Sequence, residues 1–166
     1  MFERKREPVE GWTPPSPLER KAILDETESI AIVGASANPA RASNFVATYL
    51  LSSSTNFRVY LVNPRETEIL GHPVYPSLQD LPETPDLVDA FRRSEDLPGV
   101  AEESVEVGAK TFWAQLGLWN EDAAKIASDA GLDAVMNRCT KIEHARFAGG
   151  LHLAGFDTGV ISSRRR

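Results

Sequence analysis

The chain has 166 residues, of which 42% are hydrophobic and 25% charged, as expected for a single globular domain. A formal net charge of −6 argues against nonspecific nucleic-acid binding, because such binding needs a basic surface. One cysteine excludes an intramolecular disulfide and any multi-cysteine metal site. No apolar run reaches the ~20 residues of a membrane span, and no signal-peptide pattern follows the N-terminus. These features predict a soluble, cytoplasmic protein.

Residues 1–15 are rich in proline and predict an extended N-terminal arm. We expect Trp12 to anchor this arm against the body of the protein or against a neighbouring subunit. Ser16 is suited to cap a helix that runs to about residue 28, because Pro17 follows it and Glu19 stands at the third helical position.

Short apolar segments alternate with helical patterns along the rest of the chain. Strands are predicted at residues 29–33, 57–62, 86–91, 110–115 and 132–136, and helical periodicity is found over 42–50, 97–107 and 121–130. Residues 69–75 form at best a short irregular strand, because they contain Gly71 and Pro73, and residues 77–81 form one helical turn.

This alternation predicts an α/β fold. We expect a Rossmann-like, doubly wound, mostly parallel sheet of five or so strands, with helices on both faces. The expected domain covers residues 16–147, between the arm at 1–15 and a C-terminal extension at 148–166.

The stretch from Ser29 to Ser43 predicts a phosphate-binding loop. An apolar strand ends at Gly34, a small polar loop follows, and a helical pattern begins at Ala42. Glycine permits a sharp turn and the close approach of a ligand to the backbone. The helix that follows directs its unpaired N–H groups and the positive end of its dipole toward an anion.

The loop departs from the dinucleotide fingerprint G-x-G-x-x-G. Gly34 matches the first glycine, but Ser36 and Pro39 occupy the second and third positions. The second strand ends in Asn63-Pro64-Arg65 and not in the acidic residue that binds the ribose of NAD. An NAD site is therefore disfavoured, whereas an NADP site stays open through Arg65. The Gly-Lys-Ser/Thr of a P-loop is absent.

Several motifs resemble those of the CoA-binding-domain family. They are Gly34-Ala35-Ser36 with Asn38-Pro39, Arg41 and Ser43; Val62 to Arg65; Val88 to Arg93; Lys110 to Gly117; and Met136 to Cys139 with Lys141, Glu143 and His144. They come in the family's order between about residues 25 and 147. This family is related to the CoA-binding domain of the succinyl-CoA synthetase α subunit. The resemblance implies a stand-alone Rossmann-like protein that binds coenzyme A (CoA) or an acyl-CoA.

CoA carries a pyrophosphate and a ribose 3′-phosphate, so its site needs backbone donors and cations near the carboxyl ends of the strands. The predicted cofactor-binding residues are Gly34, Ala35, Ser36, Ala37, Asn38, Pro39, Arg41, Ser43, Asn63, Pro64, Arg65, Phe91, Arg92, Arg93, Gln115 and Gly117. Arg41 and Arg92 are expected to pair with phosphates, and Phe91 to pack against the adenine or the pantetheine.

The expected role is non-catalytic: a carrier, a sensor or a partner module, with no catalytic residue and no metal. One alternative is a small NADP-dependent oxidoreductase. Another is a thiol-redox role in which Cys139, beside Arg138 and Lys141, exchanges with the CoA thiol; the simpler interpretation of Cys139 is a small buried hydrophobe. The proline-rich arm with Trp12 makes a homodimer plausible.

Overall fold

The computed structural model describes residues 11–148. The strands are β1 (Ser29–Val33), β2 (Arg58–Val62), β3 (Glu68–Ile69), β4 (His72–Tyr75), β5 (Leu87–Ala90), β6 (Thr111–Ala114) and β7 (Asp133–Val135). The α-helices are α1 (Pro17–Glu26), α2 (Ala42–Leu50), α3 (Leu97–Val107), α4 (Glu121–Asp129) and α5 (Thr140–Ala148), with 3-10 turns at Leu78–Asp80 and Ser94–Asp96. Residues 1–10 of the predicted arm and 149–166 of the predicted extension lie outside the described residues.

The strands of the described residues form one sheet in the order β3-β4-β2-β1-β5-β6-β7. Neighbouring strands from β4 to β7 are parallel, and β3 pairs antiparallel with β4. β1 lies between β2 and β5, where the strand order changes direction, and all its residues are buried. The predicted Rossmann-like, mostly parallel α/β sheet is confirmed.

The structure differs from the prediction at residues 68–75, which form two strands instead of one irregular strand. Ile69 pairs with His72, and the two residues between them, Leu70 and Gly71, both have positive φ (54° and 77°). Such a turn matches the twist of a two-stranded hairpin. It was missed because leucine seldom adopts positive φ.

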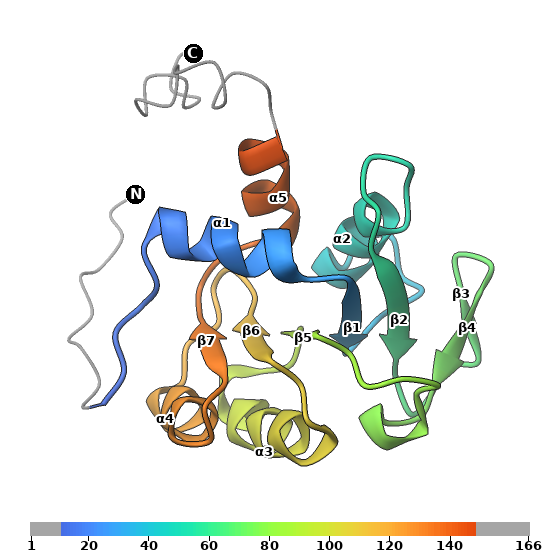
Figure 1. Cartoon of the computed structure of the whole chain (residues 1–166). Helices are drawn as coiled ribbons and strands as arrows, with labels where there is room; N and C mark the ends of the chain where they lie inside the picture. Colours follow the sequence, from blue (N-terminus) through green and yellow to red (C-terminus); the bar gives the residue numbers. More distant parts are fainter. Residues whose placement is uncertain (1–10, 149–166) are drawn as a thin grey trace.

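Successive β1 side chains point to two separate hydrophobic cores. Ala31 and Val33 pack with α3 and α4 on one face, and Ile30 and Ile32 pack with α1, α2 and α5 on the other. Figure 1 shows these two helical layers on opposite sides of the sheet. A strand that is covered on both faces is apolar at nearly every position, which explains why β1 was recognisable from sequence.

Helix α5 was not predicted, and a long-range ion pair ties it to the fold. Glu143 of α5 is buried and pairs with buried Arg20 of α1. Arg20 Nη1 also donates a hydrogen bond to the carbonyl oxygen of Pro15 (2.8 Å). Because α5 buries a charged residue, its sequence lacks the apolar stripe that identifies a helix.

Trp12 anchors residues 11–16 to the body of the protein, which is one of the two expected roles. Its side chain is 7% exposed, and its Nε1–H donates to the carbonyl oxygen of Ala134 in β7 (3.0 Å). Its ring meets Trp119 edge to face, with centroids 5.6 Å apart.

Candidate functional site

Gly34 ends β1 in a conformation that other residues disfavour. Its φ is +88°, and a Cβ at this position would lie 2.6 Å from the carbonyl oxygen of Phe91. The N–H groups of Gly34 and Ala35 both donate to the carbonyl oxygen of Val62 at the end of β2 (3.0 and 3.2 Å). Because Gly34 has no side chain, the carboxyl ends of β1, β2 and β5 can meet beneath the loop.

The asparagines of the loop region hold its backbone in place. Asn63 Nδ2 donates to the carbonyl oxygen of Ala35 (2.7 Å), and Asn63 Oδ1 accepts from the N–H of Arg65 (2.8 Å). Asn38 Oδ1 accepts from the N–H of Ala40 (2.9 Å). The predicted residues Asn38 and Asn63 thus use these side-chain atoms to shape the loop.

The loop and the start of α2 present unsatisfied backbone donors. The N–H groups of Ser36, Ala37, Ala42 and Ser43 make no hydrogen bond within residues 11–148. α2 has no side-chain cap, because its N-cap residue is Arg41. Free N–H groups at a helix N-terminus attract anions, so this backbone can bind a phosphate.

A hollow of about 660 Å³ opens between α2 and α5, beside the donors of Ser36, Ala42 and Ser43. Predicted residues that line it are Gly34, Ser36, Arg41, Ser43, Phe91, Arg92, Arg93, Gln115 and Cys139. The predicted residues Ala35, Ala37, Asn38, Pro39, Asn63, Arg65 and Gly117 do not line it. Pro64 lines a neighbouring hollow of about 330 Å³, to which Arg92 also contributes. Arg92 is therefore accessible from both hollows.

The three arginines of the larger hollow differ in their partners. Arg93 Nε lies 3.2 Å from Asp96 and 3.3 Å from Glu95, and these carboxylates raise the pKa of Arg93. The side chains of Arg41 and Arg92 make no ion pair or hydrogen bond within the described part of the chain. Arg41 and Arg92 are thus the cations available to an anionic ligand.

A buried polar cluster lies at the β6 side of the hollow. Gln115 Oε1 accepts from the N–H (3.0 Å) and from Oγ1 (3.1 Å) of Thr140. Thr140 Oγ1 also lies 2.7 Å from Oδ2 of Asp89, which is fully buried. Burial raises the pKa of Asp89 to about 8, and the hydrogen bond from Thr140 Oγ1 to its carboxylate opposes this rise.

Sequence reasoning missed the apolar part of the hollow, which consists of Ala42, Phe45, Val46, Leu116, Leu118 and Ile142. Phe45, Leu116 and Ile142 are 60%, 59% and 46% exposed. In the sequence they have no distinguishing pattern, because an apolar residue is first assigned to a core.

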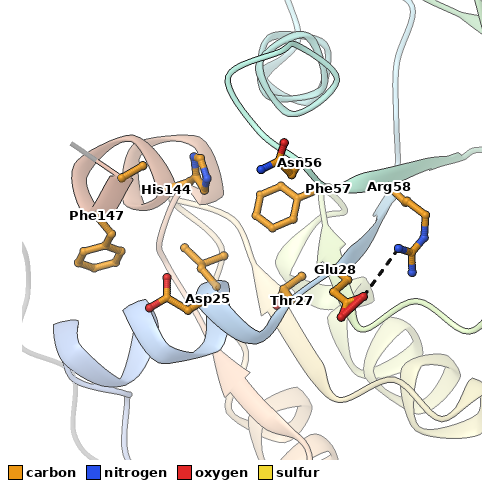
Figure 2. Close-up of a pocket in the computed structure, with 10 residues that line it drawn as sticks. Asp25, Thr27, Glu28, Asn56, Phe57, Arg58, His144 and Phe147 are labelled. Carbon is orange, nitrogen blue, oxygen red and sulfur yellow. Dashed lines mark ion pairs between the residues drawn. The ribbon is translucent and has the colours of Figure 1, made fainter. Parts of the chain in front are cut away.

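A further hollow of about 310 Å³ lies at the opposite, amino end of β1 and β2 (Figure 2). Its cation, Arg58, is held by Glu83 through two hydrogen bonds (2.8 and 2.9 Å), and the nearby Glu28 carboxylate lies 3.9 Å away. His144 there shares a hydrogen bond with the hydroxyl of Tyr49 (2.8 Å). This hollow therefore offers an anion neither a free cation nor a helix N-terminus.

Within residues 11–148, no cluster of His, Cys, Asp and Glu side chains is suited to hold a metal ion. Over the same range, the helices are too short or too polar to cross a bilayer.

The mostly parallel sheet with helices on both faces defines a Rossmann-like protein, and free backbone N–H groups lie at the carboxyl end of β1. Residues 28–145 match the family model described as a CoA binding domain, and the chain belongs to this family. It is 41% identical to the uncharacterized protein YneT of Bacillus subtilis (strain 168) over 131 residues, which are 79% of this chain and 96% of YneT.

Two further comparisons have different coverage. A hypothetical protein from Pyrococcus horikoshii OT3 superposes with a TM-score of 0.76 and 37% identity, covering 89% of this chain and 100% of that chain. An ADP-forming acetate–CoA ligase of Archaeoglobus fulgidus is 36% identical over 74 residues, which are 45% of this chain but 10% of the ligase. The similarity to the ligase is thus confined to a small part of that enzyme.

Proposed function

We propose that the protein binds CoA or an acyl-CoA in the hollow between α2 and α5, as a non-catalytic binding, carrier or regulatory protein. One observation carries the proposal: Ser36, Ala42 and Ser43, which have free N–H groups, line the same hollow as the unpaired Arg41 and Arg92, on an acidic chain. Charge-assisted hydrogen bonds to phosphate are the strong interactions that such an arrangement offers.

Family membership and the name of the A. fulgidus ligase support CoA as the ligand. The chain spans a tenth of that ligase, so ligase activity does not transfer to it. The predicted exchange, in which the Cys139 thiolate attacks CoA disulfide, forms a mixed disulfide and releases one CoA thiol, is supported by the position of Cys139 in the hollow. Intact mass after incubation with CoA disulfide tests it: an unmodified Cys139 removes the idea. A homodimer and a cytoplasmic location also stay predictions.

Calorimetric titration with CoA tests the proposal. The wild-type protein is compared with three variants, each of which lacks one arginine of the hollow. Arg41→Ala and Arg92→Ala each remove an unpaired cation, and we expect each to raise the Kd for CoA by about 10-fold or more, since a hydrogen bond to a charged group contributes roughly 1.5–3 kcal/mol. Arg93→Ala is the control, because that guanidinium is already paired with Asp96 and Glu95. We expect it to change the Kd by no more than about twofold.

Absence of heat with CoA, or equal effects of all three substitutions, would contradict the proposal. NADPH serves as the competing ligand. Selective binding of NADPH would favour the oxidoreductase alternative over a CoA-binding role.

A further inference from the structure

Gln115 presents a fixed, unused hydrogen-bond donor to the hollow. The N–H of Thr140 can only donate, so the atom of Gln115 that faces it must be the amide oxygen. The Nε2 group therefore points away from Thr140, and it makes no hydrogen bond within residues 11–148. Gln115 is 4% exposed and lines the hollow. This donor is open to the hollow, where an acceptor on a ligand can pair with it.

Exposed apolar side chains gather at the mouth of the same hollow. Phe45 of α2, Ile142 of α5 and Leu116 after β6 all line it, although about half of each surface is exposed to solvent. Lys141 of α5 lies 3.5 Å from the centre of the Phe45 ring, so α2 and α5 approach each other here. An apolar group bound in this groove would cover surface that water now contacts.

The anion-binding groups, the Gln115 donor and the apolar side chains are arranged across the hollow in the order of the strands. The free N–H groups and Arg92 lie at the ends of β1 and β5, and Gln115 follows β6, two strands from β1 and roughly 10 Å away. The neighbouring β7 leads through Cys139 into α5. One ligand that fills this hollow must therefore be anionic at one end, accept a hydrogen bond further along and carry an apolar group.

We infer that the hollow is built for an acyl-CoA with an aliphatic acyl chain. The thioester carbonyl accepts a hydrogen bond from Gln115 Nε2, and the chain lies on Phe45, Leu116 and Ile142. This inference rests on the proposed CoA site and extends it, since free CoA has neither the thioester carbonyl nor the chain.

The test compares the Kd values of CoA, octanoyl-CoA and its thioether analogue S-octyl-CoA, which keeps the chain but lacks the carbonyl. For the wild-type protein we expect octanoyl-CoA to bind at least 10-fold more tightly than CoA, and S-octyl-CoA to lie between them. Ile142→Ser should reduce the preference for octanoyl-CoA over CoA at least threefold. Leu18→Ser, at an apolar residue that is 75% exposed on α1 and outside the hollow, is the matched control and should leave all three values unchanged.

Gln115→Glu tests the carbonyl contact, because glutamate keeps an oxygen for Thr140 but has no N–H to donate. We expect this variant to lose the preference for octanoyl-CoA over S-octyl-CoA. If Gln115→Glu does not fold, Ile142→Ser, at the surface, still tests the chain contact.

Equal affinity of the wild-type protein for CoA and octanoyl-CoA would overturn the inference while leaving the CoA site intact. No binding of any of the three ligands would overturn the proposed function itself. If Ile142→Ser instead dissociates a dimer seen by sedimentation, and no acyl preference exists, the groove is a subunit interface and the inference is wrong.

Discussion

At the scale of single residues, Gly34 combines two separate constraints. Its φ of +88° disfavours any side chain, and a Cβ would meet the backbone oxygen of Phe91 at 2.6 Å. Gly131 has nearly the same φ, +86°, but open space around the Cβ position. The two glycines therefore separate the cost of the backbone conformation from the cost of the clash.

We expect Gly131→Ala to lower the free energy of unfolding by about 1 kcal/mol, the conformational cost alone. Gly34→Ala should lower it by about 3 kcal/mol, because strand ends must move apart as well. Gly34→Ala should also weaken CoA binding, since the loop rests on these strand ends. Urea denaturation measures the first effect and calorimetry the second. Equal losses of stability in the two variants would show that the close contact with Phe91 relaxes without cost.

Asp89 predicts an unusual pH dependence of stability. Burial raises the pKa of its carboxyl to about 8 in the folded protein, above its ordinary value of 3.8. Between these two values the folded state holds a proton that the unfolded state has released. Its contribution to stability is therefore fully present below pH 4 and is lost as the pH rises toward 8, by up to about 1.4 kcal/mol for each pH unit.

Asp89→Asn removes this dependence, because an amide does not titrate and can still form a hydrogen bond with Thr140 Oγ1. We expect the variant to fold and to be more stable than the wild-type protein at pH 8, with a smaller difference at pH 5. Urea denaturation at both pH values is the measurement. A variant that loses the same stability at both pH values would show that Asp89 is ionised in the folded protein.

At the scale of elements, α5 is held by the buried pair of Arg20 and Glu143. Removing one member of a buried pair leaves the other charge uncompensated, so Glu143→Ala should lower the free energy of unfolding by about 3–5 kcal/mol. Arg20→Met combined with Glu143→Leu should restore most of that loss, because neither charge is then left buried alone. Urea denaturation of the single and double variants gives both values.

An exposed pair on the same helix provides the control for this comparison. Lys21 pairs with Asp25 across one turn of α1, and both side chains contact solvent. Lys21→Ala should change stability by less than about 0.5 kcal/mol. If Glu143→Ala had an effect this small, α5 would be held by its apolar contacts instead of the ion pair.

The difference between β1 and α5 shows what the sequence can predict here. β1 and Gly34 are defined by local rules: an apolar run covered on both faces and a turn that requires glycine. The resemblance to the CoA-binding-domain family also rests on short motifs at the strand ends, and so does the prediction that Arg41 and Arg92 bind phosphates. α5 depends on Arg20, which lies 123 positions away, and the sequence does not show that contact. The apolar mouth of the hollow depends likewise on how α2 and α5 come together.

At the scale of the whole molecule, the start of the described chain is attached to the face opposite the hollow. Trp12 belongs to the core that α3 and α4 share with the sheet, and it contacts β7 and Trp119. Val46, Phe91 and Cys139 of the hollow belong to the other face, and Leu118 is the lining residue that packs against the core of Trp12. Stability contributed by Trp12 should therefore be separable from ligand binding.

Trp12→Ala removes a large, nearly buried ring and its hydrogen bond to Ala134, so we expect the free energy of unfolding to fall by about 3–5 kcal/mol. Trp12→Phe keeps an aromatic ring but leaves the Ala134 carbonyl without its donor, and should cost about 1–2 kcal/mol. Well below the melting temperature, both variants should bind CoA with a Kd within twofold of the wild-type value. If either variant bound CoA at least 10-fold more weakly while still folded, the two faces of the sheet would be coupled, and the arm would take part in forming the ligand site.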